Sequence, residues 1–474
     1  MSNIFKIKQI STEDIQSSKL KRTLTASNLV SLGIGAVIGA GIFVITGNAA
    51  AIHAGPAIVI SFILSAFACV LAGLCYAEFS SMFPVAGSAY SYSYATMGEF
   101  IAWILGWDLI LEYLLGASTV AVGWSGYVVS FLADLGIIIP AIIANAPIDY
   151  SENGWGFTGA IINFPAVFIV SVLVTLLVLG VKESAKINNI IVLIKVIVIL
   201  LFIGFGLSFV NVQNWEPFIP ANTGKFSNFG WTGILSGAAI VFFAYIGFDA
   251  VSTAAQEAKN PQRDIPRGIL ISLLICTTLY IAVALVLTGI VKYTELNVSA
   301  PIALAIDTVG SSLKWLSPLI KIGAIAGLSS VVMVLLFGQS RIFFSMSNDG
   351  LLPPIFSKVH KKFKTPHITT IIVGIACAVF AGVFPINILG KMVSIGTLLA
   401  FTIVCIGIVI LRKKRPDLPR PFRTPLVPFL PILGALICLT QMFSLSLDTL
   451  WQLLIWIAIG IVIYFAYGRK HSKI

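Results

Sequence analysis

A glycine-rich stretch near the amino end constrains this chain more than any other segment. No Asp, Glu, Lys or Arg occurs between Leu29 and Ile52, so this segment is apolar enough and long enough to cross a bilayer. Four glycines nevertheless fall within its part 31–43, and each costs roughly 1 kcal/mol of helix stability relative to alanine. In lipid, a loosened backbone is tolerated only where it faces protein or a water-filled cavity. We therefore predict a discontinuous helix broken at Gly39-Ala40-Gly41, whose freed N–H groups point at an anionic group.

Close helix packing through small residues is the alternative explanation of these glycines. A single glycine run in a membrane helix favours packing over a functional break. The choice therefore depends on whether a second interrupted helix occurs elsewhere in the chain.

The composition is typical of an integral membrane protein with many spans. Of the 474 residues, 58% are hydrophobic and 10% are charged, against about 25% charged residues in soluble domains. Apolar windows predict an all-α fold with twelve transmembrane helices. We read 98–139 as one span plus a short re-entrant or interfacial piece, and 424–467 as two spans broken near 445–448. The remaining spans lie near 27–52, 57–82, 160–180, 188–210, 231–254, 267–291, 315–343, 367–385 and 391–411.

Basic residues gather on one side of this predicted topology. Most of the 30 Lys and Arg residues fall in segments that a cytoplasmic amino terminus would place inside the cell. This distribution satisfies the positive-inside rule, so we predict a multi-pass protein of the plasma membrane with cytoplasmic termini at 1–26 and 468–474. The net charge of +11 then requires no nucleic-acid partner. The six cysteines lie within apolar runs at spacings that match no metal site.

A second irregular stretch lies in the predicted sixth span, from Gly237 to Asp249. It combines aromatic residues, glycine and a carboxylate where a plain membrane helix would carry leucine. Five spans precede it over 27–210, and five more begin with it over 231–411, so the second half is inverted relative to the first. Interrupted helices that open both halves predict an inverted-repeat transporter with its site at the midplane, extended by two helices in 424–467.

Lys195 is the clearest ionisable residue inside a predicted span. Apolar residues flank it on both sides, and at ~1.5 Å per residue it lies about 10 Å from the cytoplasmic end of its span, too deep for comfortable snorkelling. Burying a charge in lipid costs several kcal/mol, which makes such a residue a functional candidate. Two roles are possible for this lysine. It exchanges a proton during transport, or it stays charged and only binds the free carbonyl groups at a helix break.

Three further ionisable residues lie in otherwise apolar surroundings. Because buried charges are usually paired, we predict that Glu112, Asp249 and Lys321 form one water-linked network. Other carboxylates lie nearer the predicted span ends and are interpreted as structural: Glu78, Glu99 and Asp108.

Four motifs occur in order along the chain. They are Gly-Ala-Val-Ile-Gly-Ala-Gly-Ile-Phe at 35–43, Phe-Ala-Tyr-Ile-Gly-Phe-Asp at 243–249, Glu-Ala-Lys-Asn-Pro-Gln-Arg-Asp-Ile-Pro-Arg-Gly-Ile at 257–269 and Gly-Gln-Ser-Arg-Ile-Phe-Phe-Ser-Met-Ser-Asn-Asp-Gly-Leu-Leu-Pro-Pro at 338–354. Together they resemble the amino acid–polyamine–organocation superfamily, specifically bacterial members of its cationic amino acid transporter branch. The resemblance covers nearly the whole chain and implies a LeuT-like five-plus-five inverted repeat with broken helices 1 and 6.

The resemblance also implies how a substrate is held. In that family, backbone N–H and C=O groups of the broken helices bind the α-carboxylate and α-amino groups of an amino acid. Many relatives carry serine or threonine between the two glycines of the first break, where this chain has Ala40, so a hydroxyl contact is lost. Carried onto this chain, the substrate-binding residues are Val37, Ile38, Gly39, Ala40, Gly41, Phe243, Ala244, Tyr245 and Ile246.

Proton coupling follows from the same resemblance. Proton-coupled members carry a fifth-helix lysine where sodium-coupled relatives hold an ion, and Lys195 matches it. We expect the proton to be the coupling ion, with no metal or organic cofactor, and further coupling candidates in Glu112, Asp249 and Lys321. The expected function is symport of an L-amino acid by alternating access, and the alternative is an exchanger without proton coupling.

The substrate itself is constrained less strongly. A cationic side chain would require a free carboxylate in the pocket, so small neutral amino acids such as alanine are slightly favoured over cationic ones. Whether a small accessory membrane subunit takes part is open. An enzyme is disfavoured because the sequence has no HExxH or paired-Cys motif, and a channel because no polar stripe marks a pore.

Overall fold

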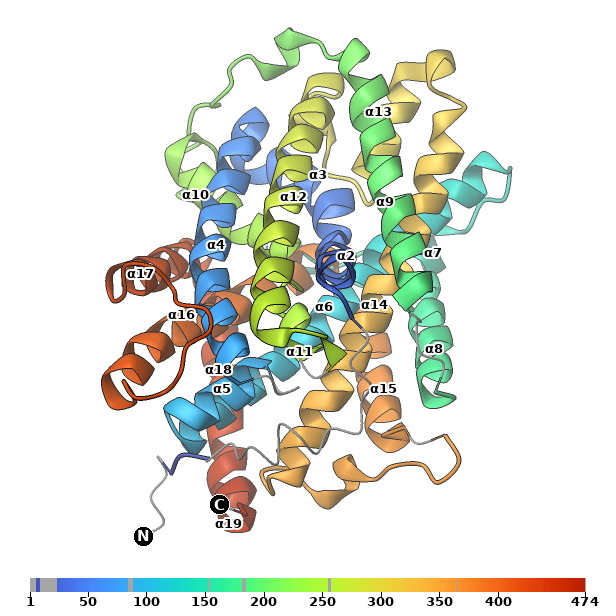
Figure 1. The fold of residues 1–474 in the computed structure, drawn as a ribbon. Coiled ribbons are helices and arrows are strands. Elements are labelled where there is room, and N and C mark those ends of the chain that lie inside the picture. Colours follow the sequence, from blue (N-terminus) through green and yellow to red (C-terminus); the bar gives the residue numbers. More distant parts are fainter. Residues whose placement is uncertain are drawn as a thin grey trace.

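The computed structural model is a helical bundle in which the tertiary packing positions two interrupted helices (Figure 1). It describes residues 6–8, 24–83, 88–151, 154–180, 185–254, 257–363 and 365–473. Most of the predicted amino-terminal segment 1–26 lies outside the described residues. Residues 6–8 and the carboxyl end meet at the same end of the bundle, where the backbone N–H of Glu99 donates to the carbonyl of Lys6 and the Ser472 hydroxyl contacts the Glu99 carboxylate.

Eight helical stretches in the described part of the chain are long and apolar enough to cross a membrane, and four shorter apolar helices accompany them. This confirms a multi-span helical membrane protein. The main helices in chain order are α2 Ala26–Val37, α4 Ile58–Met82, α5 Ser88–Thr96, α6 Glu99–Asp134, α8 Phe164–Val178, α9 Ala185–Gly206, α10 Gly230–Val241, α12 Pro261–Ile290, α13 Pro301–Val309, α14 Leu316–Asn348, α15 His367–Val383, α16 Ile386–Lys414, α17 Phe429–Phe443 and α18 Leu447–Ile463.

The range 98–139 differs from the prediction. Instead of a span and a separate re-entrant piece, α6 is one continuous helix of 36 residues. Trp124, in the second half of this range, is buried within α6 and donates from its indole N–H to Ser329 of α14. The helix ends beside Gly136, whose φ of +80° favours glycine.

A short antiparallel hairpin departs from the predicted all-α fold. Strands β1 (Ile148–Ser151) and β2 (Gly154–Phe157) pair with Ile148 opposite Phe157 and Ser151 opposite Gly154. The hairpin follows the four-residue helix α7 (Ala141–Ala144) in the connection between α6 and α8. Each strand has only four residues, the shortest length over which alternation of apolar and polar residues indicates a strand.

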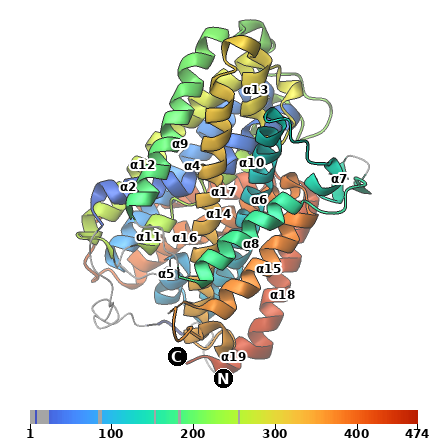
Figure 2. The same ribbon diagram turned by 90° about the vertical axis from the view of Figure 1, so that its right-hand side faces the viewer.

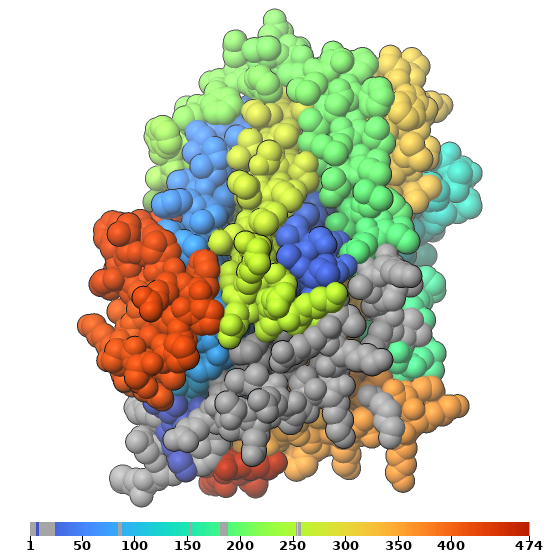
Figure 3. All heavy atoms as spheres, in the orientation of Figure 1, coloured from blue at the N-terminus to red at the C-terminus, as the bar shows by residue number. Residues whose placement is uncertain are grey.

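Long helices pack against one another and against the interrupted ones. α6 packs against α14 and α16, α12 packs against α2 and α4, and α8 lies beside α15 (Figure 2). Figure 3 shows α2, in dark blue, filling the space between α12 and α9. The last two helices, α17 and α18, are separated at residues 444–446, close to the predicted break.

Candidate substrate site

The first helix is interrupted, and the interruption begins earlier than predicted. α2 ends at Val37, Ile38 has an extended backbone with φ −72° and ψ 96°, and the helix resumes as a π-helical turn, η1 (Gly41–Ile45). The predicted break at Gly39-Ala40-Gly41 is therefore shifted to Ile38 and Gly39. The first N–H groups of the resumed helix have no preceding helical turn to accept them, so they are available to a ligand.

Gly41 serves close packing instead of the break. A Cβ built on Gly41 would overlap the Cα and Cβ atoms of Ala244 in the sixth helix. Both explanations of the glycine run thus hold, but at different glycines. Gly39 is in the irregular segment, and Gly41 lets the two interrupted helices touch.

The sixth helix is interrupted where the sequence predicted. α10 passes into a 3₁₀ turn, η6 (Phe242–Tyr245), and Ile246 then has an extended backbone before the short helix α11 (Ala250–Thr253). Gly247 has a φ of +110°, which only glycine adopts readily. A Cβ on Gly247 would lie 2.9 Å from the carbonyl oxygen of Ala36, so this break lies directly against the end of α2.

Tyr280 of α12 joins the two breaks and was missed by the sequence analysis. Its hydroxyl lies 2.8 Å from the carbonyl oxygen of Val37 and 2.8 Å from that of Ala244. Carbonyl groups at a helix end have no N–H donor within the helix, and the buried Tyr280 hydroxyl is the hydrogen-bond donor here. In the sequence, Tyr280 is one aromatic residue in an apolar span, and nothing local distinguishes it.

Lys195 caps the end of α2. Its side chain is fully buried, and its ammonium donates to the carbonyl oxygens of Gly35 at 2.8 Å and Ile38 at 3.0 Å. A cation is stabilised at a helix carboxyl end by the helix dipole. Gly327 of α14 makes room for the lysine stem, because a Cβ there would lie 2.9 Å from Lys195 Cε. The structure therefore contains the bracing contacts, and exchange of a proton at Lys195 stays a prediction.

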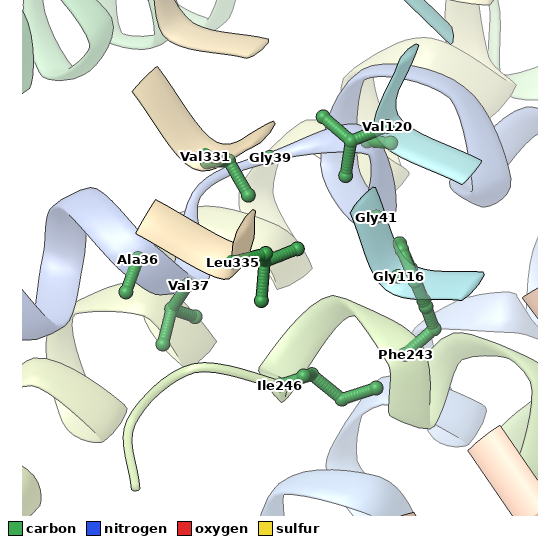
Figure 4. A pocket seen from close by; sticks show the side chains of 11 residues that line it. Ala36, Val37, Gly39, Gly41, Gly116, Val120, Phe243, Ile246, Val331 and Leu335 are labelled. Carbon is green, nitrogen blue, oxygen red and sulfur yellow. The ribbon is translucent and has the colours of Figure 1, made fainter. Parts of the chain in front are cut away.

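The cavity between the breaks has apolar walls (Figure 4). Its volume of about 20 Å³ is far below the roughly 300–1,000 Å³ of typical ligand pockets. The broken helices supply one side, α6 and α14 supply the other, and no lining side chain carries a charge. The lining residues are Ala36, Val37, Gly39, Ala40, Gly41, Gly116, Val120, Phe243, Ile246, Val331 and Leu335.

Six of the nine predicted substrate residues are in that lining, and three are not. Ile38, Ala244 and Tyr245 lie behind it, where Ile38 accepts from Lys195, Ala244 from Tyr280, and Tyr245 donates from its hydroxyl to Phe62 of α4. These three residues hold the breaks in shape. Sequence reasoning missed the opposite wall from α6 and α14, since apolar residues inside spans carry no signal of a cavity.

The predicted network of Glu112, Asp249 and Lys321 is wrong for Lys321. Its ammonium pairs with Asp134 at 2.7 Å, at the end of α6, and with Asp307 of α13 at 3.3 Å. Lys321 lies near the start of α14, where it ties α13 to α6. Sequence position alone could not reveal that two carboxylates outside the apolar spans reach this lysine.

Glu112 and Asp249 do lie close together, and a third carboxylate joins them. Glu112 interacts electrostatically with Asp249 and with Asp108, and the Tyr113 hydroxyl lies 3.2 Å from Asp249. Asp108 was interpreted as a structural residue near a span end, but it is fully buried within α6 and neither of its carboxyl oxygens has a hydrogen-bond partner among the described residues. This acidic cluster is not part of the cavity lining.

Sequence comparison decides the family. The model of the amino acid permease family matches residues 24–465. The chain belongs to the amino acid permease family. This permease is accordingly a multi-pass membrane transporter of the amino acid–polyamine–organocation superfamily and not an enzyme.

The relatives of the permease carry different names. It is 49% identical over 474 residues to the methylthioribose transporter of Bacillus subtilis (strain 168), covering 100% of this chain and 99% of the relative. It is 48% identical over 456 residues to the branched-chain amino acid permease BcaP of the same organism, covering 96% and 95%. Identity to the vacuolar cationic amino acid transporter 2 of Arabidopsis thaliana is 40% over 413 residues, covering 86% of this chain and 63% of the relative.

Two buried carboxylates of the permease have structural contacts away from the cavity. Glu78 of α4 accepts hydrogen bonds from the Arg412 guanidinium at 3.0 and 2.7 Å and from the Thr424 backbone N–H at 2.7 Å. Glu99 accepts from the hydroxyls of Tyr94 and Tyr464, both at 2.9 Å. Glu78 thus joins α4 to Arg412 at the end of α16 and to Thr424 in the connection that follows it. Glu99 joins the start of α6 to Tyr94 of α5 and to Tyr464 after α18.

Proposed function

We propose that this permease takes up a neutral L-amino acid across the plasma membrane by proton-coupled symport, with alternating access around the cavity between its two broken helices. The observation that carries this proposal is that an open helix amino end and two helix carboxyl ends meet at one apolar cavity. Such an arrangement suits a zwitterion, whose carboxylate and ammonium groups need opposite partial charges.

The backbone offers the two kinds of group that an amino acid requires. The N–H groups of Gly39, Ala40 and Gly41 would bind the α-carboxylate at the start of η1. Carbonyl groups at the ends of α2 and η6, including that of Phe243, would accept from the α-ammonium group. The hydroxyl that Ala40 lacks is not needed for either contact.

The apolar lining supports a neutral side chain. Val120, Val331 and Leu335 offer no counter-charge to a cationic one, and an unpaired buried charge is costly. The named substrates of the relatives differ, since they include methylthioribose, branched-chain amino acids and cationic amino acids. Methylthioribose has no carboxylate or ammonium group for the helix ends, so we favour an amino acid.

Lys195 is the proposed coupling group. When protonated it can donate to both Gly35 and Ile38, and loss of a proton removes a donor and the positive charge from the end of α2. Substrate binding next to the break would then be linked to the protonation of Lys195. Glu112 and Asp249 are secondary candidates for the proton path because of their burial and mutual proximity.

The proposed topology has twelve spans with both termini in the cytoplasm. It divides the stretch Gly41–Met82 at Gly55, whose φ of +59° interrupts the helix, so that each half, 27–210 and 231–411, contains five spans. Helices α17 and α18 lie outside this inverted repeat. Single added cysteines at exposed Lys473 and Lys292, labelled from either side of sealed vesicles, test the orientation.

The decisive experiment is uptake into proteoliposomes of labelled alanine, leucine, arginine and methylthioribose, with and without an inward proton gradient. The native chain and Lys195→Ala are compared, together with counterflow in the absence of a gradient. We expect gradient-driven accumulation of alanine and leucine that disappears in Lys195→Ala, while counterflow persists.

Two results would overturn parts of this proposal. Gradient-independent exchange that is unchanged in Lys195→Ala would favour the alternative, an amino acid exchanger in which Lys195 stays charged. Uptake of arginine or methylthioribose without uptake of alanine or leucine would overturn the neutral substrate.

A further inference from the structure

Gly116 of α6 is a glycine at a position where the packing would also accept alanine. A Cβ built there would lie 3.4 Å from Leu335 Cδ1 and 3.9 Å from Val393 Cγ1, both ordinary van der Waals separations. The position is within a continuous α-helix, where alanine is the better helix former. The fold alone therefore gives no reason for glycine.

Other glycines of α6 have a packing reason. A Cβ on Gly106 would lie 2.8 Å from Met346 Cε, on Gly123 3.0 Å from Val44 Cγ2, and on Gly126 2.6 Å from Ser299 Cβ. Each of these positions admits a neighbouring element at close range. Gly116 differs from them because what it borders is the cavity.

The cavity wall around Gly116 is built from two helices. Gly116 and Val120 are one turn apart on α6, and Val331 and Leu335 are one turn apart on α14, so each pair presents one face. All four line the same space, opposite Phe243 and Ile246 (Figure 4). A side chain at Gly116 would occupy space between α6 and Leu335.

We propose that Gly116 sets the upper size limit of the substrate side chain, because the space that a methyl group would fill at this position is left to the substrate between α6 and α14. This inference rests on the proposed function and adds a specificity-determining residue to it. With the α-carboxylate and α-ammonium groups held by the broken helices, the side chain extends toward Gly116, Val331 and Leu335. A methyl group at Gly116 then competes with the outer carbons of leucine but not with alanine.

The test is the ratio of leucine to alanine transport, measured as kcat/KM in proteoliposomes. Methyl-sized changes in apolar pockets discriminate by roughly 10- to 200-fold, so we expect Gly116→Ala to lower the leucine-to-alanine ratio about tenfold or more. Adding Leu335→Ala to Gly116→Ala shortens the side chain opposite position 116 and so enlarges the cavity again. This double variant is expected to restore leucine transport in part. Gly204→Ala is the matched control, because Gly204 is exposed on α9 and a Cβ there meets no atom within 4 Å.

The outcomes separate this inference from the proposed function. If the native chain transports neither alanine nor leucine, the proposed function fails and this inference falls with it. If the native chain transports both and Gly116→Ala leaves their ratio equal to that of Gly204→Ala, only the role of Gly116 is overturned. An equal loss for both amino acids would likewise overturn it, since that indicates a structural effect. Should Gly116→Ala not insert, Leu335→Ala alone must raise the transport of phenylalanine relative to alanine, or the inference is wrong.

Discussion

Gly41 and Ala244 are in close contact, so the two interrupted helices touch where the first helix resumes after its break. A Cβ on Gly41 would overlap Ala244 Cα and Cβ, and backbone cannot move aside as a flexible side chain can. This contact makes the separation of the two broken helices depend on a single missing methyl group.

Gly41→Ala is therefore expected to abolish transport and lower thermal stability. Overpacking of this kind costs about 1–3 kcal/mol, and here it also moves the carbonyl and N–H groups that face the cavity. Uptake in proteoliposomes and the midpoint of thermal unfolding measure the two effects. Gly204→Ala, with open space at its Cβ, should be unaffected. Native uptake by Gly41→Ala would show that the close contact is not required.

Tyr280→Phe removes the hydroxyl that lies between the carbonyls of Val37 and Ala244. This hydroxyl has one proton to share between the two carbonyls, and leaving a buried acceptor unsatisfied costs about 1–3 kcal/mol. We expect reduced stability and a marked fall in kcat/KM. Tyr464→Phe is the comparison, because it removes one buried hydroxyl contact, to the Glu99 carboxylate, away from the cavity. If both variants lose the same amount of transport, Tyr280 has no special role in shaping the site.

Glu78→Gln is expected to destabilise the fold without a specific effect on substrate affinity. Glu78 is fully buried, and its carboxylate binds the Arg412 guanidinium while Arg420 Nε lies 3.4 Å away. Removing one partner of a buried ion pair costs about 3–5 kcal/mol. Size-exclusion chromatography after heating measures the change. The exposed pair of Asp417 with Arg415 supplies the control, and Asp417→Asn should leave the thermal midpoint unchanged. A native midpoint for Glu78→Gln would contradict this prediction.

Lys321→Gln is expected to lower the stability of the protein without changing the dependence of uptake on the proton gradient. Because Lys321 pairs with Asp134 and Asp307 at the ends of α6 and α13, its loss should loosen α13 and lower stability. The ratio of uptake with and without a proton gradient should stay that of the native chain, in contrast to Lys195→Ala. A gradient ratio near one in folded Lys321→Gln would place this lysine in the coupling path after all.

Much of the architecture could be read from local sequence. The apolar stretches predicted the helices, and the glycines of the first and sixth spans marked where helices are interrupted. Lys195 stood out because a charge deep in an apolar stretch must find partners. Its partners, the carbonyls of Gly35 and Ile38, are at the break that the glycines indicated.

The remaining features depend on which helices pack together. α6 continues past Trp124, whose indole N–H donates to Ser329 of α14, a contact that no local window of sequence contains. Tyr280 and Gly116 look like ordinary residues of apolar spans until the breaks and α14 are placed beside them.

By itself, the sequence determined that the chain enters a membrane as many helices, which helices are irregular, and which lysine lies deepest, because these follow from transfer energies and backbone propensities of neighbouring residues. The tertiary structure decided that Lys321 pairs with Asp134 and Asp307, that Asp108 joins Glu112 and Asp249, and that α6 and α14 form the cavity wall. The physical reason is that hydrogen bonds, ion pairs and steric contacts act over a few ångströms and can join residues that are distant in the chain. Lys321 and Asp134, for example, are 187 positions apart.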